Sequence, residues 1–119
     1  MNSPRSFPRY GEVYDVELDP VVGSETGKTR PALIVSNDEN NDFSDTVTVL
    51  PFTGQPVQRI YPFEFLIPEG IAGLTATSRG KANQIRTVDK ARLRRLRGQL
   101  PRSFFPDVHR AIKHHLNLE

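Results

Sequence analysis

The sequence contains no cysteine among its 119 residues. This absence excludes disulfide frameworks, thiol nucleophiles and cysteine-based zinc sites. It also fits the reducing cytoplasm, where we expect the protein to act. The histidines are confined to His109, His114 and His115, within the last eleven residues. A histidine-based metal site elsewhere in the chain is therefore excluded, and we expect neither a metal nor a cofactor.

Long apolar runs are also missing, the longest being about four residues around Ala32 and Val35. A membrane helix needs roughly 20, so we expect no contact with a membrane and no signal-peptide core. Hydrophobic residues make up 36% and charged residues 25%, a composition typical of a soluble folded chain. At roughly 150 residues per domain the length predicts one domain, which we place at residues 10–118 after a flexible lead at residues 1–9.

Charge is distributed unevenly along the chain. Residues 1–78 contain 5 Lys or Arg and 11 Asp or Glu, whereas residues 79–119 contain 11 Lys or Arg and 3 Asp or Glu. The basic residues are densest from Arg92 to Arg97. Such a block indicates a polyanionic partner, either nucleic acid or an acidic protein segment. The alternative is a solvated face that balances the acidic half within the fold.

Short alternating or β-branched stretches separated by glycine and proline predict a β-rich chain. In residues 12–18 the alternation places Tyr14, Val16 and Leu18 on one face. Further strands are expected at residues 31–35, 46–53 and 63–67, with weaker candidates at 74–78 and 82–87. Residues 37–45 are polar and are expected to form a turn.

Helical periodicity is convincing only at the end of the chain, where Phe105, Val108, Ile112 and Leu116 share one face. Asp89 is a candidate N-cap for a short helical turn reaching Leu93. The fold class expected is mainly β with a C-terminal α-helix, in a small, open, SH3-like or CcdB-like barrel.

The loop at residues 23–31 contains Gly-x-x-x-Gly-Lys-Thr, which is close to a phosphate-binding loop. That motif needs four residues between its glycines and a helix after it, whereas here three intervene and Pro31 begins a strand. A nucleoside triphosphatase is therefore rejected. The loop instead delivers Glu25, Lys28 and Arg30 to the start of a buried strand, and the guanidinium of Arg30 suits a phosphate or a carboxylate. An intramolecular ion pair is the alternative role for Arg30.

Two further stretches carry polar groups in suggestive positions. Thr53 lies at the end of an expected strand, where its hydroxyl is able to bind a phosphate oxygen or to serve a turn. Alternation in residues 83–89 places Gln84 and Arg86 on one face, away from Ile85. Gln84 suits base edges and Arg86 suits phosphate, unless both simply decorate a half-buried strand.

Together these stretches resemble the MazF/PemK (Kid) family of toxin endoribonucleases. The matching motifs are 11–20, 22–25, 27–37, 47–53 and 84–90, and the similarity covers about residues 10–118. It implies an SH3-like barrel that acts as a homodimer. It also implies metal-independent cleavage of single-stranded mRNA at short sequences, with 2′,3′-cyclic phosphate and 5′-hydroxyl ends. A cognate antitoxin would neutralise the enzyme by covering the RNA groove.

By position, the resemblance implies that Arg30 and Thr53 are catalytic and that Glu25 contributes to activity. Four other residues within the matching stretches are assigned to RNA binding: Lys28, Ser36, Gln84 and Arg86. The chain departs from the family at two places, with Asn83 where an acidic residue is frequent and a basic, glycine-containing segment at residues 77–82 where an apolar strand is usual. The alternatives are a non-catalytic SH3-like module that binds nucleic acid or protein, and a gyrase poison of the CcdB type.

Overall fold

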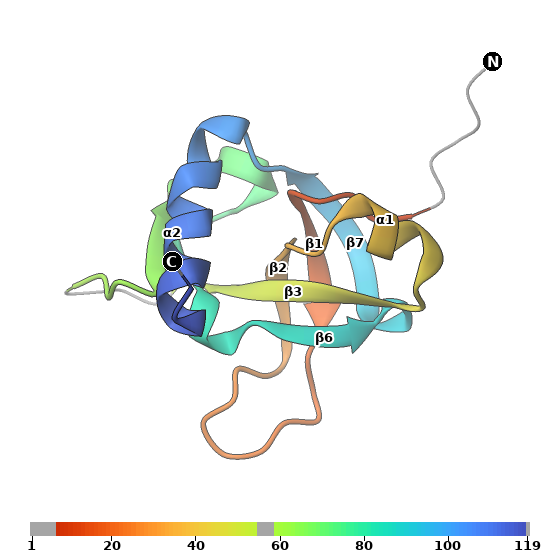
Figure 1. Ribbon diagram of the computed structural model, residues 1–119. Helices are drawn as coiled ribbons and strands as arrows, with labels where there is room; N and C mark the ends of the chain where they lie inside the picture. Colours follow the sequence, from red (N-terminus) through yellow and green to blue (C-terminus); the bar gives the residue numbers. More distant parts are fainter. Residues whose placement is uncertain (1–6, 55–58, 119) are drawn as a thin grey trace.

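The computed structural model describes residues 7–54 and 59–118. Within these residues one antiparallel sheet of seven strands dominates, with a C-terminal helix packed against it (Figure 1). The strands are Glu12–Glu17 (β1), Thr29–Ile34 (β2), Thr46–Thr53 (β3), Glu64–Ile67 (β4), Ser78–Lys81 (β5), Arg86–Asp89 (β6) and Leu93–Gln99 (β7). The helices are Asp38–Phe43 (α1) and Phe105–Leu116 (α2). Four 3-10 turns complete the described elements: Ile71–Gly73 (η1), Ala82–Gln84 (η2), Lys90–Arg92 (η3) and Arg102–Phe104 (η4).

The sheet runs in the order β4-β5-β3-β2-β1-β7, and β6 pairs with the first half of β3. The long strand β3 therefore has two partners on the same edge, β6 beside Thr46–Val49 and β5 beside Phe52 and Thr53. Among the described residues no pairing joins β4 to β7, so the barrel is open, as expected from the sequence. This topology places the end of β3, the start of β2 and the turn after β5 close together.

The core lies on both faces of the central strands. Along β2, Leu33 faces a cluster covered by α2, whereas Ala32 and Ile34 face a second cluster formed with β1, β3 and β6. This burial on two sides explains the continuous apolar run that the sequence shows here. The alternation predicted for residues 12–18 is confirmed, because Val16 and Leu18 belong to the second cluster with Tyr14 packed beside them, whereas Val13 belongs to the first.

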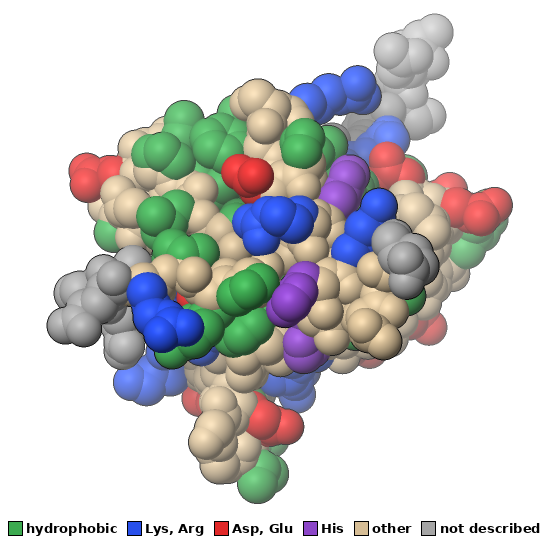
Figure 2. All heavy atoms as spheres, turned by 60° about the vertical axis from the view of Figure 1, so that its left-hand side comes forward, with side chains coloured by type: hydrophobic (Ala, Val, Ile, Leu, Met, Phe, Trp, Pro, Cys, Tyr) green, Lys and Arg blue, Asp and Glu red, His purple; other side chains and the backbone are tan. Residues whose placement is uncertain are grey.

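The helix predicted at the end of the chain is confirmed as α2, and Phe105, Val108 and Ile112 of the predicted face pack into the first cluster, whereas Leu116 is exposed. Proline stands in its first turn, where a missing N–H costs nothing. Tyr10 packs edge-on against Phe105, its hydroxyl lies 2.7 Å from Nε2 of His109, and burial raises the pKa of this phenol. Figure 2 shows that the face bearing α2 mixes hydrophobic side chains with basic residues and histidine. Among the described residues, no helix has the length and apolar character that crossing a bilayer requires.

Several local expectations were wrong. The turn predicted at residues 37–45 is the helix α1, which the side chain of Asn37 caps by accepting from the N–H of Asn40. The weaker strand candidates at residues 74–78 and 82–87 are displaced, because β5 begins only at Ser78 and residues 82–84 form a 3-10 turn before β6.

The helical turn predicted after Asp89 is confirmed as η3.

The flexible lead predicted for residues 1–9 falls largely outside the described residues, which begin at residue 7. Within the described part, the backbone N–H of Arg9 donates to Glu12 at 2.6 Å, and its guanidinium lies 3.7 Å from Asp38.

Candidate active site and RNA groove

Three hydrogen bonds hold the loop between β1 and β2, two within the loop and one to η2. At its base the N–H of Leu18 donates to the carbonyl of Lys28 at 2.8 Å. Near its tip Oε1 of Glu25 accepts from the N–H of Val22 at 2.7 Å. The N–H of Thr26 donates to Oε1 of Gln84 at 2.9 Å, which joins the loop to η2. These bonds give the glycine-rich loop a defined position beside the sheet.

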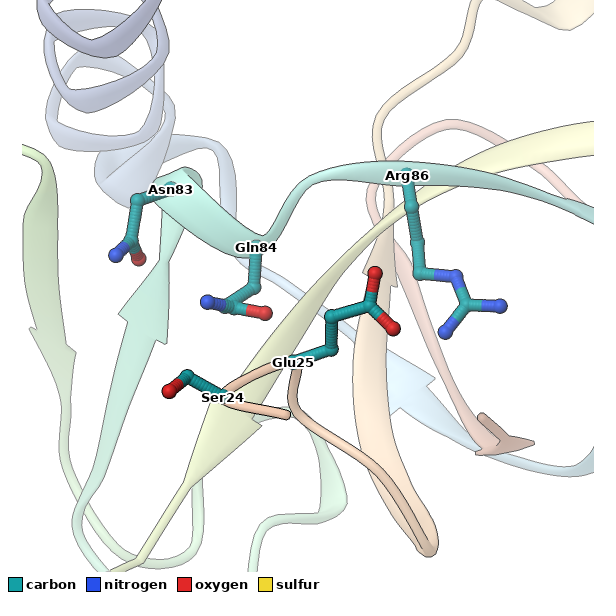
Figure 3. A pocket seen from close by; sticks show the side chains of 5 residues that line it. All are labelled: Ser24, Glu25, Asn83, Gln84 and Arg86. Atoms are coloured by element: carbon teal, nitrogen blue, oxygen red, sulfur yellow. The ribbon is translucent and has the colours of Figure 1, made fainter. Parts of the chain in front are cut away.

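A pocket of about 480 Å³ lies between this loop and the segment formed by η2 and the start of β6. Its lining residues are Ser24, Glu25, Asn83, Gln84 and Arg86. Figure 3 shows Ser24 and Glu25 on the loop, with the carboxylate of Glu25 extending toward Arg86 and the side chain of Gln84 directed toward the loop. The structure therefore brings Gln84 and Arg86 together on one side, as the sequence predicted, even though η2 rather than a strand carries Gln84.

A second pocket, of about 210 Å³, lies on the other side of the same loop. Its lining residues are Ser24, Glu25, Thr26, Gly27, Arg30, Thr53, Arg79 and Lys81. Because both pockets include Ser24 and Glu25, they adjoin across the loop. We refer to the two pockets together as the groove.

Arg30 and Thr53 are held in the second pocket by β2 and β3. The Nε of Arg30 donates to the carbonyl of Gly27 at 2.9 Å, and the side chain is half-buried. Thr53 is the last residue of β3 and is 7% exposed. The structure thus places a fixed guanidinium and a hydroxyl in one small cavity, an arrangement that suits a phosphate group. The alternative role for Arg30 was an intramolecular ion pair. Among the described residues Arg30 forms no ion pair.

Arg86 contributes a second guanidinium, in the first pocket. Its Nη1 donates to the carbonyl of Leu18 at 3.0 Å, so β6 and the end of β1 fix its direction. Glu25 lies between the two pockets and is exposed. Among the described residues that line the groove, Glu25 is the only carboxylate.

Sequence reasoning missed Arg79 and Lys81, which also line the second pocket. The segment that carries them was noted only as a departure from the family pattern. The alternation Arg-Gly-Lys was the available signal, because it places both cations on one face of a strand and glycine on the other. A Cβ at Gly80 would overlap the ring of Phe65, so glycine is required where β5 packs on this buried aromatic ring.

Two residues assigned to RNA binding lie outside the groove linings. Lys28 is exposed and has a φ of 65° at the end of the loop. Ser36 follows the far end of β2, where its hydroxyl donates to Oδ1 of Asn41 at 2.5 Å and accepts from the N–H of Thr48 at 2.9 Å. Within the described residues Ser36 therefore has a structural role at α1.

The arginine block forms η3 and β7 at the edge of the sheet, outside both groove linings. Arg94 lies 3.0 Å from Glu17, and Arg95 and Arg97 lie 3.6 and 2.9 Å from Asp15. Arg92 donates to the backbone carbonyls of Glu17 and Asp19. These contacts favour the alternative in which the block balances the acidic first strand within the fold. Among the described residues no cluster of three or more His, Cys, Asp or Glu is arranged to hold a metal ion.

The chain is similar to known toxins over almost its whole length. Residues 9–116 match the model of the PemK-like, MazF-like toxins of type II toxin–antitoxin systems. Endoribonuclease MazF9 of Mycobacterium tuberculosis is 36% identical, over 92% of this chain and 97% of the relative.

Two solved structures share the fold. MazF from Deinococcus radiodurans has a TM-score of 0.81 at 23% identity, over 96% of this chain and all of the other. A mycobacterial endoribonuclease in complex with its cognate antitoxin has a TM-score of 0.78 at 24% identity, over 94% and 97%. With the family model covering most of the chain, this protein belongs to the PemK-like, MazF-like toxin family of type II toxin–antitoxin systems.

Proposed function

We propose that this protein is an endoribonuclease toxin that cleaves single-stranded mRNA at short sequences, without a metal ion, and is inhibited by a cognate antitoxin. Family membership supports the proposal, as does the name endoribonuclease carried by the M. tuberculosis relative. The observation that carries it is the groove itself. Two adjoining pockets connect Arg30 and Thr53, which suit a phosphate, with Gln84 and Arg86, which suit a base and the RNA backbone.

RNA contains its own nucleophile, the 2′-hydroxyl beside each phosphate. In the proposed reaction its oxygen attacks the phosphorus, the bond from phosphorus to the 5′-oxygen breaks, and that oxygen takes up a proton. The products carry 2′,3′-cyclic phosphate and 5′-hydroxyl ends. The enzyme must orient the phosphate and stabilise the negative charge that develops on its oxygens.

Arg30 suits the stabilising role, because its guanidinium is a cation whose position is fixed by the hydrogen bond to the carbonyl of Gly27. Thr53 is proposed to hydrogen-bond the same phosphate from the end of β3. Glu25 is proposed as the general base that accepts the 2′-hydroxyl proton, since it is the carboxylate in the described groove lining. Gln84 and Arg86 are proposed to hold the flanking nucleotides.

The proposal includes two protein partners. A second copy would form a homodimer and lengthen the groove for an extended single strand. An acidic antitoxin segment would compete with RNA, because cations placed to bind phosphates also bind carboxylates. The mycobacterial structure of the same fold contains an endoribonuclease in complex with its cognate antitoxin, which supports this part. Cellular mRNA as substrate places the site of action in the cytoplasm.

The test is incubation of the wild-type protein with a long transcript in EDTA, followed by mapping of fragment ends. Discrete fragments with 2′,3′-cyclic phosphate and 5′-hydroxyl ends are expected. An Arg30→Ala sample prepared in parallel controls for contaminating nucleases. Intact RNA with a retarded band would instead indicate a non-catalytic binding module, and intact RNA with inhibited DNA supercoiling would indicate a gyrase poison.

A further inference from the structure

A buried carboxylate lies directly behind the second pocket. Glu64, the first residue of β4, is 2% exposed. Its Oε1 accepts from the N–H of Tyr61 at 3.1 Å, and its Oε2 accepts from Nη1 of Arg79 at 3.3 Å. Its backbone carbonyl accepts from Arg110 of α2 at 3.2 Å. Three segments therefore fix the position of this carboxylate.

The partner of Glu64 lines the pocket that contains the proposed reaction centre. Arg79 pairs with Thr53 across the β3–β5 ladder and, with Arg30, belongs to the lining of that pocket. Its side chain is 17% exposed, so it is largely withdrawn from bulk water. The guanidinium of Arg79 thus comes from the residue paired with Thr53, and the buried carboxylate of Glu64 orients it.

The fold satisfies Arg79 incompletely. Its Nε is buried and has no hydrogen-bond partner among the residues that the structure describes. By contrast, Arg97 on β7 binds Asp15 through Nη1 and the carbonyl of Gly73 through both Nε and Nη2. Burying an ion pair adds little stability by itself, and an unsatisfied buried donor lowers it. Stability alone therefore gives little reason for an arginine at this position, and the place of Arg79 in the pocket lining suggests another, the binding of a ligand there.

We propose that Arg79 binds a phosphate of the RNA in the pocket with Arg30 and Thr53, and that Glu64 is the positioning residue that holds its guanidinium there. The inference rests on the proposed endoribonuclease function and adds a substrate-binding residue that this chain supplies from β5. A guanidinium held by a carboxylate on one edge still offers N–H groups to a phosphate on another. Gly80 supports the arrangement, because it lets β5 lie against Phe65.

The test measures binding of an RNA oligonucleotide that spans a mapped cleavage site and carries 2′-deoxyribose at the cleaved position. Arg79→Gln is expected to weaken binding by about 10- to 100-fold, as for a lost charge-assisted hydrogen bond. It should also reduce the slope of log K against log salt by about 0.7, the value for one phosphate contact of a single strand. Arg79→Lys should recover most of that slope. The matched control is Arg94→Gln, which removes an arginine from the exposed pair with Glu17 and should leave affinity and slope unchanged.

Glu64→Gln tests the positioning role. It should weaken binding in the wild-type background and have little further effect in the Arg79→Gln background, because coupled residues are not additive. An unchanged slope in Arg79→Gln would overturn the phosphate contact, even if the variant is less stable to heat. Equal effects of Glu64→Gln in both backgrounds would overturn the positioning role. Failure of the wild type to cleave the all-ribose oligonucleotide would instead count against the proposed function.

Discussion

The backbone N–H of Thr26 donates to the side-chain oxygen of Gln84 at 2.9 Å, across 58 residues of sequence. This bond joins the loop that carries Glu25 to the turn that lines the first pocket. Gln84 therefore lines the groove and at the same time holds the loop that the two pockets share. In the proposed enzyme, contact with a base and placement of the reacting groups depend on one side chain.

Gln84→Ala is expected to lower kcat by about fivefold, the effect of one net hydrogen bond, because the loop loses its tie to η2. Hydrogen exchange at the amide of Thr26 should become faster in the same variant. Asn83→Ala is the matched control, since Asn83 lines the same pocket and its Oδ1 has no hydrogen-bond partner within residues 7–54 and 59–118. Unchanged protection at Thr26 in Gln84→Ala would contradict this account.

Arg30→Ala is expected to reduce kcat by about 10²–10³, the effect of removing one fixed donor to developing charge. Lys28→Ala should stay within about threefold of the wild type, because Lys28 is exposed and lies outside the groove lining. Initial cleavage rates on one mapped oligonucleotide compare the two, with circular dichroism to verify folding. Near-normal cleavage by a folded Arg30→Ala protein would remove Arg30 from the mechanism.

Gly80→Ala is expected to destabilise the fold by about 1–3 kcal/mol, because the added methyl group overlaps the ring of Phe65. For a chain of this length that corresponds to a loss of about 4–12 °C in Tm. Gly54→Ala is the control, since its Cβ would stand 3.6 Å from that of Ala76, an ordinary contact. Thermal unfolding followed by circular dichroism measures both. Adding Phe65→Leu to Gly80→Ala should restore part of the lost Tm, and the absence of any recovery would show that the strain lies elsewhere.

In solution the protein is expected to be a homodimer of about 27 kDa, twice the chain mass of 13.4 kDa. An extended single-stranded RNA needs a longer groove than one small barrel offers. The face bearing α2 exposes hydrophobic side chains among basic ones (Figure 2). Leu116, in the last turn of α2, is 49% exposed. Sedimentation at micromolar concentration decides the point, and a mass near that of one chain would contradict it.

The tail of the cognate antitoxin is expected to displace RNA from the groove, and its binding should weaken with salt. Arg86→Ala should weaken inhibition because Arg86 lines the groove, whereas Arg94→Gln should not because Arg94 already pairs with Glu17. The measurement is RNA cleavage titrated with the tail peptide, together with displacement of labelled oligonucleotide. Inhibition that leaves the RNA bound would rule out a shared groove.

The sequence predicted the strands wherever burial dictates residue type. Runs of branched or aromatic residues predict β2, β3 and β4, and an apolar stripe predicts α2. The helix α1 gives no such signal, because its one large apolar residue, Phe43, is 82% exposed and its buried residue is Asn41. Its stability comes from a cap and side-chain hydrogen bonds, which hydrophobic periodicity does not register. The strand β7 was missed for a related reason, since its arginines pair with acidic residues of β1 that are distant in sequence.

Some residues of the candidate site could be predicted from the sequence, and others could not. Arg30, Thr53, Gln84 and Arg86 were identified from motifs, and the structure gathers all four in the groove. Arg79 became apparent only through the β3–β5 register, which places it opposite Thr53. Ser36 was assigned from its position within a matching motif, but a motif does not show that its hydroxyl is bonded to Asn41.

The pairing of β7 with β1 has a consequence for how RNA would arrive. Arg94, Arg95 and Arg97 lie close to two carboxylates of β1, Glu17 and Asp15, which offset part of their positive charge. The described groove, by contrast, lines its walls with four cations and a single carboxylate. Even when Glu64, the buried partner of Arg79, is counted as well, cations outnumber carboxylates at the groove, although the whole chain has a net charge of only +2. A polyanion is attracted by such a local excess of positive charge, so the association rate should depend on the charge of the groove as well as on that of the whole molecule.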